Sequence, residues 1–260
     1  MPEHATVTIA RLAPEWKQPA AKALCTQLEA LSRQVPAEAV IHAGRNLIFR
    51  HRVGDEEVAV KRFPVSGGRQ FIYRLRASKA VRAFDTAARL LALGVGTPRP
   101  LAAVEARRGG APLASFYCCA FLPTFQEARS LKSLGAPDRA GLLELLGEFI
   151  GRLHESGVEH RDLTSGNVLL IPDPDRRAGV TFQLVDLNRV RFGRIGIGTG
   201  LANLAQLRLQ DSEALLSGYC RARSLVASRA APYYRFRLGL RTARQLIKER
   251  TRPLRRRLGL

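Results

Sequence analysis

The most constraining feature of this sequence is residues 160–170, which read His-Arg-Asp-Leu-Thr-Ser-Gly-Asn-Val-Leu-Leu. Residues 137–156 before this segment place leucines, Phe149 and Ile150 at helical spacing, which predicts one wide apolar helix face. Gly157 is positioned to end that helix, and residues 168–171 form a short apolar run typical of a buried strand. The pattern therefore predicts a polar loop between a packed helix and a strand, with an acid and an amide five residues apart.

The acid and the amide of this loop, Asp162 and Asn167, match the H-R-D-x-x-x-x-N catalytic loop of kinases. An aspartate in this position accepts a proton from the attacking hydroxyl group and orients it, which is the catalytic role predicted for Asp162. An asparagine five residues later offers a neutral oxygen to Mg²⁺, which predicts that Asn167 binds the metal and the nucleotide.

A second acid, Asp186, follows the apolar run 182–185 and lies 19 residues after Asn167. Kinases carry the aspartate of D-F-G at this point, and that aspartate chelates the Mg²⁺ that bridges the β- and γ-phosphates. Asp186 is therefore predicted to bind metal and nucleotide, although Asn188 replaces the usual glycine.

A candidate nucleotide anchor lies in the first third of the chain. Residues 58–61 read Val-Ala-Val-Lys and resemble the strand whose lysine contacts the α- and β-phosphates, so Lys61 is predicted to bind ATP. The helix predicted at residues 78–93 contains one acid, Asp85, which is the expected partner of Lys61.

The phosphate-covering loop has a weaker signal, because the sequence has no G-x-G-x-x-G motif. Gly44 precedes the predicted hairpin of strands 46–53 and 57–63, where such a loop is expected, and with Arg45 it is the candidate. An alternative interpretation of Gly44 is an ordinary turn.

These segments predict an α+β, two-lobed, protein-kinase-like fold. Residues 1–122 are predicted to form an N-lobe with a helical extension, a five-stranded, mostly antiparallel sheet and one helix. Residues 123–232 are predicted to form a helical C-lobe that carries the catalytic loop. Residues 233–260 are predicted to be a basic tail.

With these motifs, residues 93–100 (Leu-Gly-Val-Gly-Thr-Pro-Arg-Pro) and 185–192 (Val-Asp-Leu-Asn-Arg-Val-Arg-Phe) resemble the bacterial lipopolysaccharide kinase family. That family includes 3-deoxy-manno-octulosonic acid (Kdo) kinases and heptose kinases. The resemblance implies an ATP- and Mg²⁺-dependent phosphotransferase with an alcohol acceptor. The implied acceptor is a sugar hydroxyl of the lipopolysaccharide inner core, a lipid-linked saccharide at the cytoplasmic face of the inner membrane.

Two other functions stay open. No Ala-Pro-Glu segment follows Asp186, which argues against a regulated eukaryotic-type protein kinase but leaves a RIO-like atypical protein kinase possible. A tRNA-associated kinase-like ATPase is also compatible with the loop and with the charge of the chain.

The charge is strongly positive, because 42 Lys and Arg face 22 Asp and Glu, for a formal net charge of +20. From Tyr234 onward there are ten basic residues and one acid, interspersed with leucines and an isoleucine. Such a segment suits an anionic membrane surface or RNA, or forms a solvated helix face.

The sequence lacks a secretory signal pattern and an apolar run long enough to cross a membrane. The four cysteines contain no CxxC pair and are expected to be free thiols. These features predict a cytoplasmic protein with at most peripheral membrane contact, and they leave its oligomeric state open.

Overall fold

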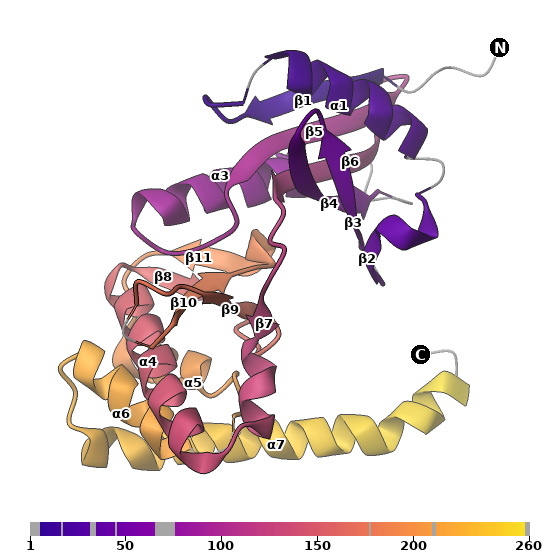
Figure 1. The fold of residues 1–260 in the computed structure, drawn as a ribbon. Helices are drawn as coiled ribbons and strands as arrows, with labels where there is room; N and C mark the ends of the chain where they lie inside the picture. The colour runs from indigo at the N-terminus through magenta and orange to yellow at the C-terminus, as the bar shows by residue number, and fades with distance from the viewer. Residues whose placement is uncertain are drawn as a thin grey trace. The chain divides into compact units, whose positions relative to one another are not determined.

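The computed structural model describes residues 6–16, 18–31, 35–44, 46–65, 76–176, 178–209 and 212–257. The chain divides into two compact units (Figure 1). The first comprises Met1–Pro123 with Asp186–Asn188, and the second comprises Thr124–Val185 with Arg189–Leu260.

The first unit is built on a six-stranded sheet of order β1-β5-β6-β4-β3-β2, in which all neighbouring strands are antiparallel. The strands are β1 (Thr6–Leu12), β2 (Val40–Ala43), β3 (Leu47–Val53), β4 (Glu56–Pro64), β5 (Pro100–Arg108) and β6 (Ala111–Ala120). Five strands were predicted for this sheet and the structure has six; neither β1 nor β2 was recognised from its own segment. Strand β1 is half-exposed and pairs with β5, nearly a hundred residues away, so its own segment gives little local signal.

Two helices of the first unit border this sheet, α1 (Gln18–Leu31) and α3 (Lys79–Ala92), and a short 3₁₀ helix, η1, spans Ala37–Ala39. Helix α3 begins at Ser78, whose Oγ accepts a hydrogen bond from the Val81 N–H, and it is followed by Gly94 at a positive φ of 71°. Its buried face, which includes Val81, Phe84 and Leu90, packs on β5 and β6.

The second unit is mainly helical. Its helices are α4 (Ala136–Glu155), α5 (Ile197–Leu204), α6 (Ser212–Ala222) and α7 (Ala227–Arg257), with the 3₁₀ helix η2 at Ala128–Ser133. Its strands are β7 (Gln126–Glu127), β8 (Val158–His160), β9 (Val168–Pro172), β10 (Val180–Leu184) and β11 (Val190–Phe192). They form a β10-β9-β7 sheet and a β11-β8 pair, and the 3₁₀ turn η3 (Leu187–Arg189) joins β10 to β11.

Helices α4 and α6 form the closest helix pair of the second unit, and two glycines permit that approach. A Cβ atom on Gly147 would lie 2.0 Å from the Leu215 carbonyl oxygen, and one on Gly218 would lie 1.9 Å from the Glu144 carbonyl oxygen. The predicted apolar face of α4 is buried, with Leu143, Leu146, Ile150 and Leu153 at most 1% exposed.

Helix α7 includes residues 233–257 of the segment predicted as a separate basic tail, and the expected boundary at residue 233 falls inside this helix. Its first turns contact α5 and α6, and its later part extends beyond them (Figure 1). No helix within the described ranges combines the length and the apolar character needed to span a bilayer. All four cysteines are free thiols.

Candidate active site

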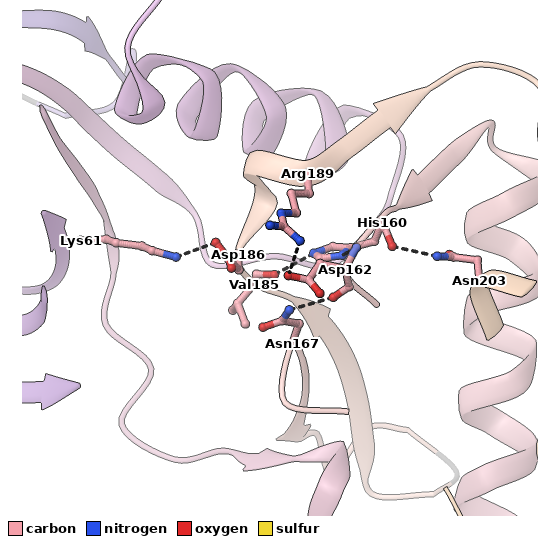
Figure 2. Close-up of polar contacts among 8 residues, drawn as sticks. All are labelled: Lys61, His160, Asp162, Asn167, Val185, Asp186, Arg189 and Asn203. Atoms are coloured by element: carbon pink, nitrogen blue, oxygen red, sulfur yellow. Dashed lines mark hydrogen bonds and ion pairs between the residues drawn. The ribbon is translucent and has the colours of Figure 1, made fainter. Parts of the chain in front are cut away.

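His160, the first residue of the catalytic-loop motif, ends β8 and is completely buried. Its Nε2–H donates to the Val185 carbonyl oxygen at 2.9 Å, and its Nδ1 accepts from the Asp162 N–H at 3.3 Å. These two partners define the neutral tautomer with the proton on Nε2. His160 thereby ties the start of the loop to the residue that precedes Asp186 (Figure 2).

The loop folds back so that Asp162 and Asn167 meet. Asn167 Nδ2 donates to the Asp162 carbonyl oxygen at 2.8 Å, and the Thr164 N–H donates to the same oxygen at 2.7 Å. The hydrogen bond from Nδ2 thus fixes the orientation of the Asn167 side-chain amide. Asn167 Oδ1 accepts no hydrogen bond from any residue that the structure describes.

The Asp162 carboxylate is about one-third exposed, and Arg189 Nη1 donates to its Oδ2 at 3.3 Å. Its Oδ1 accepts no hydrogen bond within the described part of the chain. This oxygen can therefore accept a proton from an incoming hydroxyl group while Arg189 holds the other oxygen in place.

Lys61 and Asp186 form an ion pair, with Lys61 Nζ 2.7 Å from Asp186 Oδ1. Lys61 lies on β4, between strands β3 and β6, and its side chain is only 16% exposed. Asp186 has a left-handed backbone with φ 59°, a conformation that costs non-glycine residues on the order of 1 kcal/mol or more. It directly follows Val185, whose N–H donates to the Asn167 carbonyl oxygen at 3.0 Å.

The predicted pairing of Asp85 with Lys61 is wrong. Asp85 lies on the exposed face of α3, and its Oδ1 accepts from Arg11 Nε of β1 at 2.9 Å. The residues around Lys61 signal neither β1 nor the distant Asp186, so the one acid of the helix was the expected partner.

Gly44 lies in the turn between β2 and β3, where its N–H donates to the Asn46 carbonyl oxygen at 3.3 Å. A Cβ atom at this position would lie 2.8 Å from His42 Nε2, the end of a side chain. The turn agrees with the position expected for a phosphate-covering loop, but the role of Gly44 stays a prediction. Arg45 lies outside the described residues.

A hydrogen-bonded network of buried polar groups lies behind the catalytic loop, and it was not predicted from the sequence. Asn203 of α5 donates through Nδ2 to the His160 carbonyl oxygen at 2.9 Å, and its Oδ1 accepts from His154 Nε2 at 3.0 Å. His154 Nδ1 in turn accepts from the Tyr219 hydroxyl group at 2.9 Å, and Arg223 donates to that hydroxyl oxygen at 3.0 Å.

All the side chains of this hydrogen-bonded network except Arg223 are nearly inaccessible to solvent, with His154 and Asn203 each 2% exposed. Burial lowers the pKa of His154 to about 4, and the charge of Arg223 acts in the same direction, while the hydrogen bond that His154 donates to Asn203 opposes both. His154 is therefore neutral at physiological pH and donates its one N–H to Asn203. An asparagine within an apolar helix segment was the only sequence signal for this network.

The residues present are compatible with a nucleotide and Mg²⁺. Asn167 offers a neutral amide oxygen, Asp186 a carboxylate, and oxygen ligands of this kind suit Mg²⁺. The described residues contain no group of three or more His, Cys, Asp or Glu that could hold a metal alone. A Mg²⁺ ion bound by either residue would therefore need phosphate oxygens as further ligands, which is how nucleotide-dependent enzymes commonly bind it.

The chain resembles known proteins over most of its length. A model of the lipopolysaccharide kinase (Kdo/WaaP) family matches residues 68–219, more than half of the chain. A solved structure of WaaP in complex with acyl carrier protein superimposes with a TM-score of 0.61 at 20% identity, covering 91% of this chain and 99% of that chain. This likeness confirms the predicted α+β, protein-kinase-like fold.

Two curated relatives match a shorter stretch. Both are probable bifunctional tRNA threonylcarbamoyladenosine biosynthesis proteins, one from Methanosarcina acetivorans (37% identical) and one from Methanosarcina mazei (36% identical). Each match spans 93 residues, which is 35% of this chain and 15% of the length of the relative.

The family match covers the catalytic loop, Asp186 and helix α3 together, and it agrees with the resemblance drawn from the sequence. The predicted enzyme class, a phosphotransferase of the kinase type, is confirmed at the level of this family. The chain belongs to the lipopolysaccharide kinase (Kdo/WaaP) family.

Proposed function

We propose that this protein is an ATP- and Mg²⁺-dependent kinase that phosphorylates a sugar hydroxyl of the lipopolysaccharide inner core, on Kdo or heptose. The observation that carries this proposal is the Asp162 carboxylate, held at Oδ2 by Arg189 and open at Oδ1. A carboxylate held in this way can orient a hydroxyl group and accept its proton. Catalysis of phosphoryl transfer depends mostly on such positioning and on neutralisation of charge.

The remaining site residues have complementary roles in this proposal. Lys61 would contact the nucleotide phosphates, and the Asp186 carboxylate that now pairs with it would bind Mg²⁺. The bound ion would neutralise charge on the β- and γ-phosphates. Asn167 would offer its amide oxygen to the metal, while its nitrogen keeps the loop closed on the Asp162 carbonyl oxygen.

Helix α7 supports a location at the cytoplasmic face of the inner membrane. Phe236, Leu240 and Ile247 lie at i, i+4 and i+11 on one face of this helix, and Phe236 and Ile247 are more than 60% exposed. Arginines flank this apolar stripe, including Arg244 and Arg250. An exposed basic amphipathic helix of this kind binds anionic lipid surfaces, with about 1 kcal/mol per basic residue near the lipid.

Phosphate transfer from radiolabelled ATP to a lipid-linked inner-core saccharide, with casein as a protein acceptor in parallel, tests the proposal. We expect Asp162→Asn to lose at least about a hundredfold in transfer rate while it still binds ATP. Near wild-type turnover in this variant would refute the catalytic role of Asp162. Phosphate transfer to casein alone would show a protein kinase instead.

The same assay tests which acid, Asp186 or Asp85, acts with Lys61. Asp186→Asn should abolish transfer, because it removes the carboxylate assigned to the metal. Asp85→Asn should retain activity, because it removes only an exposed ion pair with Arg11. The opposite order of effects would restore the pairing first predicted from the sequence.

Sedimentation with vesicles tests the membrane location. The wild type should bind vesicles that contain phosphatidylglycerol and should not bind pure phosphatidylcholine. A Phe236→Ser, Ile247→Ser double variant should bind more weakly while it keeps its transfer rate toward a water-soluble acceptor. Equal sedimentation of variant and wild type would exclude this helix face.

A second candidate, a tRNA-associated kinase-like ATPase, is favoured by the two Methanosarcina matches and by the net charge of +20. Purified protein would then carry RNA, visible as a high ratio of absorbance at 260 and 280 nm. It would also hydrolyse ATP faster when tRNA is added, without phosphorylating a saccharide.

A further inference from the structure

The face of the six-stranded sheet that α3 covers carries a short row of polar side chains on its two central strands. Lys61 of β4 lies directly opposite Tyr117 of β6. Ser115 and Cys119 lie two positions to either side of Tyr117, and side chains at alternate positions share one face of a sheet. Ser115 identifies this face, because its Oγ accepts a hydrogen bond from the Ala80 N–H of α3 at 3.4 Å. Lys61 and Tyr117 are therefore neighbours on the side that α3 covers.

Tyr117 is the polar side chain of this row that lacks a partner. It is 8% exposed, and its hydroxyl oxygen is buried without a hydrogen-bond partner among the described residues. Its neighbours are satisfied, since Ser115 Oγ binds α3 and the Cys119 thiol donates to the Ala59 carbonyl oxygen at 3.8 Å. Buried tyrosine hydroxyl groups usually find a partner, because an unpaired one destabilises the fold. A phenylalanine would fill the same space without that cost, so the hydroxyl group calls for a functional reason.

Lys61 has more donors than acceptors around it. Its ammonium group can donate three hydrogen bonds, and within the described part of the chain it donates one, to Asp186 Oδ1 at 2.7 Å (Figure 2). Its Nζ also lies 5.5 Å from the centre of the Phe63 ring. The side chain is only 16% exposed, so water can complete its hydrogen bonds only in part. Binding of Mg²⁺ by Asp186, as proposed above, would compete with Lys61 for its one acceptor.

Helix α3 offers no acid that could take the place of Asp186. Its one acid, Asp85, lies on the exposed face and pairs with Arg11. The buried residues of this helix are all apolar: Ala80, Val81, Ala83, Phe84, Ala87 and Leu90. The unpaired acceptor beside Lys61 is therefore the Tyr117 hydroxyl oxygen. Directly opposed residues of an antiparallel pair have Cβ atoms about 4.5–5.5 Å apart, and the flexible four-carbon stem of a lysine lets its ammonium group choose between neighbouring acceptors.

We propose that the Tyr117 hydroxyl group accepts a hydrogen bond from Lys61 Nζ when Asp186 binds Mg²⁺ and a nucleotide, and so holds the ammonium group toward the phosphates. Tyr117 is thus a positioning residue that acts through Lys61. This inference rests on the proposed function, in which Lys61 contacts the nucleotide phosphates. Because burial raises the pKa of the Tyr117 hydroxyl group well above its usual value, this partner stays neutral and leaves the full positive charge of Lys61 to the phosphates. A carboxylate in its place would offset part of that charge.

Isothermal titration calorimetry with ATP and Mg²⁺ tests this role on the full chain. Tyr117→Phe should raise the Kd for ATP about 10-fold, because the variant loses a hydrogen bond to a charged group. Differential scanning calorimetry without nucleotide should give a Tm equal to or above that of the wild type, because the variant also removes an unpaired buried hydroxyl group. A tyrosine with a purely structural role would not combine weaker ATP binding with undiminished stability.

A double-mutant cycle shows whether Tyr117 acts through Lys61. Lys61→Met should weaken ATP binding by itself, and addition of Tyr117→Phe to that variant should change the Kd by less than about twofold. Tyr234→Phe is the matched control, because it removes the same hydroxyl group from another buried tyrosine, on α7 of the second unit. This control should bind ATP as the wild type does.

An unchanged Kd in Tyr117→Phe, or the same loss of affinity with and without Lys61, would overturn the inference. Absence of ATP binding by the wild type would overturn it as well, together with the nucleotide role of Lys61. Failure of the proposed saccharide acceptor alone gives a different result. The wild type would then bind ATP and Tyr117→Phe would still bind it more weakly, but neither protein would phosphorylate the inner-core saccharide.

Discussion

Replacement of Asn203 by alanine should destabilise the second unit and loosen the catalytic loop. The substitution removes the donor to the His160 carbonyl oxygen and the acceptor for His154 Nε2. His160 and His154 are 0% and 2% exposed, so water cannot replace either partner. Each unsatisfied buried group costs about 1–3 kcal/mol, which gives a total loss of about 2–6 kcal/mol.

For a chain of this size, each kcal/mol lowers Tm by about 2–4 °C, so we expect Tm to fall by roughly 5–20 °C. Differential scanning calorimetry measures this shift, and Thr199→Ala on the exposed face of the same helix is the control. The rate of phosphate transfer at low temperature should also fall more than nucleotide affinity, since the backbone before Asp162 loses its anchor. A Tm within about 2 °C of the Thr199→Ala control would refute the reasoning.

Two further predictions concern the same unit. Because the pKa of His154 is about 4 in the folded protein and near 6.5 when unfolded, the unfolded chain takes up the proton first as pH falls. The free energy of unfolding should be highest above pH 6.5 and should decrease by up to about 3 kcal/mol on acidification to pH 4. Urea titrations should show that His154→Gln removes this component, and an unchanged pH dependence would contradict it. Gly147→Ala should destabilise the protein by at least about 3 kcal/mol, because the new Cβ atom would overlap the Leu215 carbonyl oxygen. Gly141→Ala on the same helix is the control. Its Cβ atom would meet no atom within 4 Å, so this variant should be neutral or stabilising. Equal urea midpoints for these two variants would disprove the close α4–α6 contact.

The sequence was informative wherever a structure depends on neighbouring residues. Helix α4 was predicted within a residue at each end, because its apolar spacing directly encodes the face that it buries. Strand β9 and the loop of Asp162 and Asn167 follow the same rule, since the four residues between the acid and the amide suffice to bring them together.

Contacts between residues that lie far apart in the sequence are determined only by the tertiary structure. Lys61 and Asp186 are 125 positions apart, and no local pattern distinguishes Asp186 from Asp85 as the partner of the lysine. Strand β1 was missed for a related reason, because a half-exposed strand is stabilised by its pairing with β5 rather than by its own composition.

The same division applies to the site as a whole. The candidate reactive groups, Asp162 and Asn167, were predicted from the sequence, because the motif places a carboxylate and an amide at a fixed spacing. The group that lies behind the loop, Asn203 of α5, became recognisable only in the fold. Hydrogen bonds act over a few ångströms in space, and only the packing of α5 against the catalytic loop determines which distant side chains come within that range.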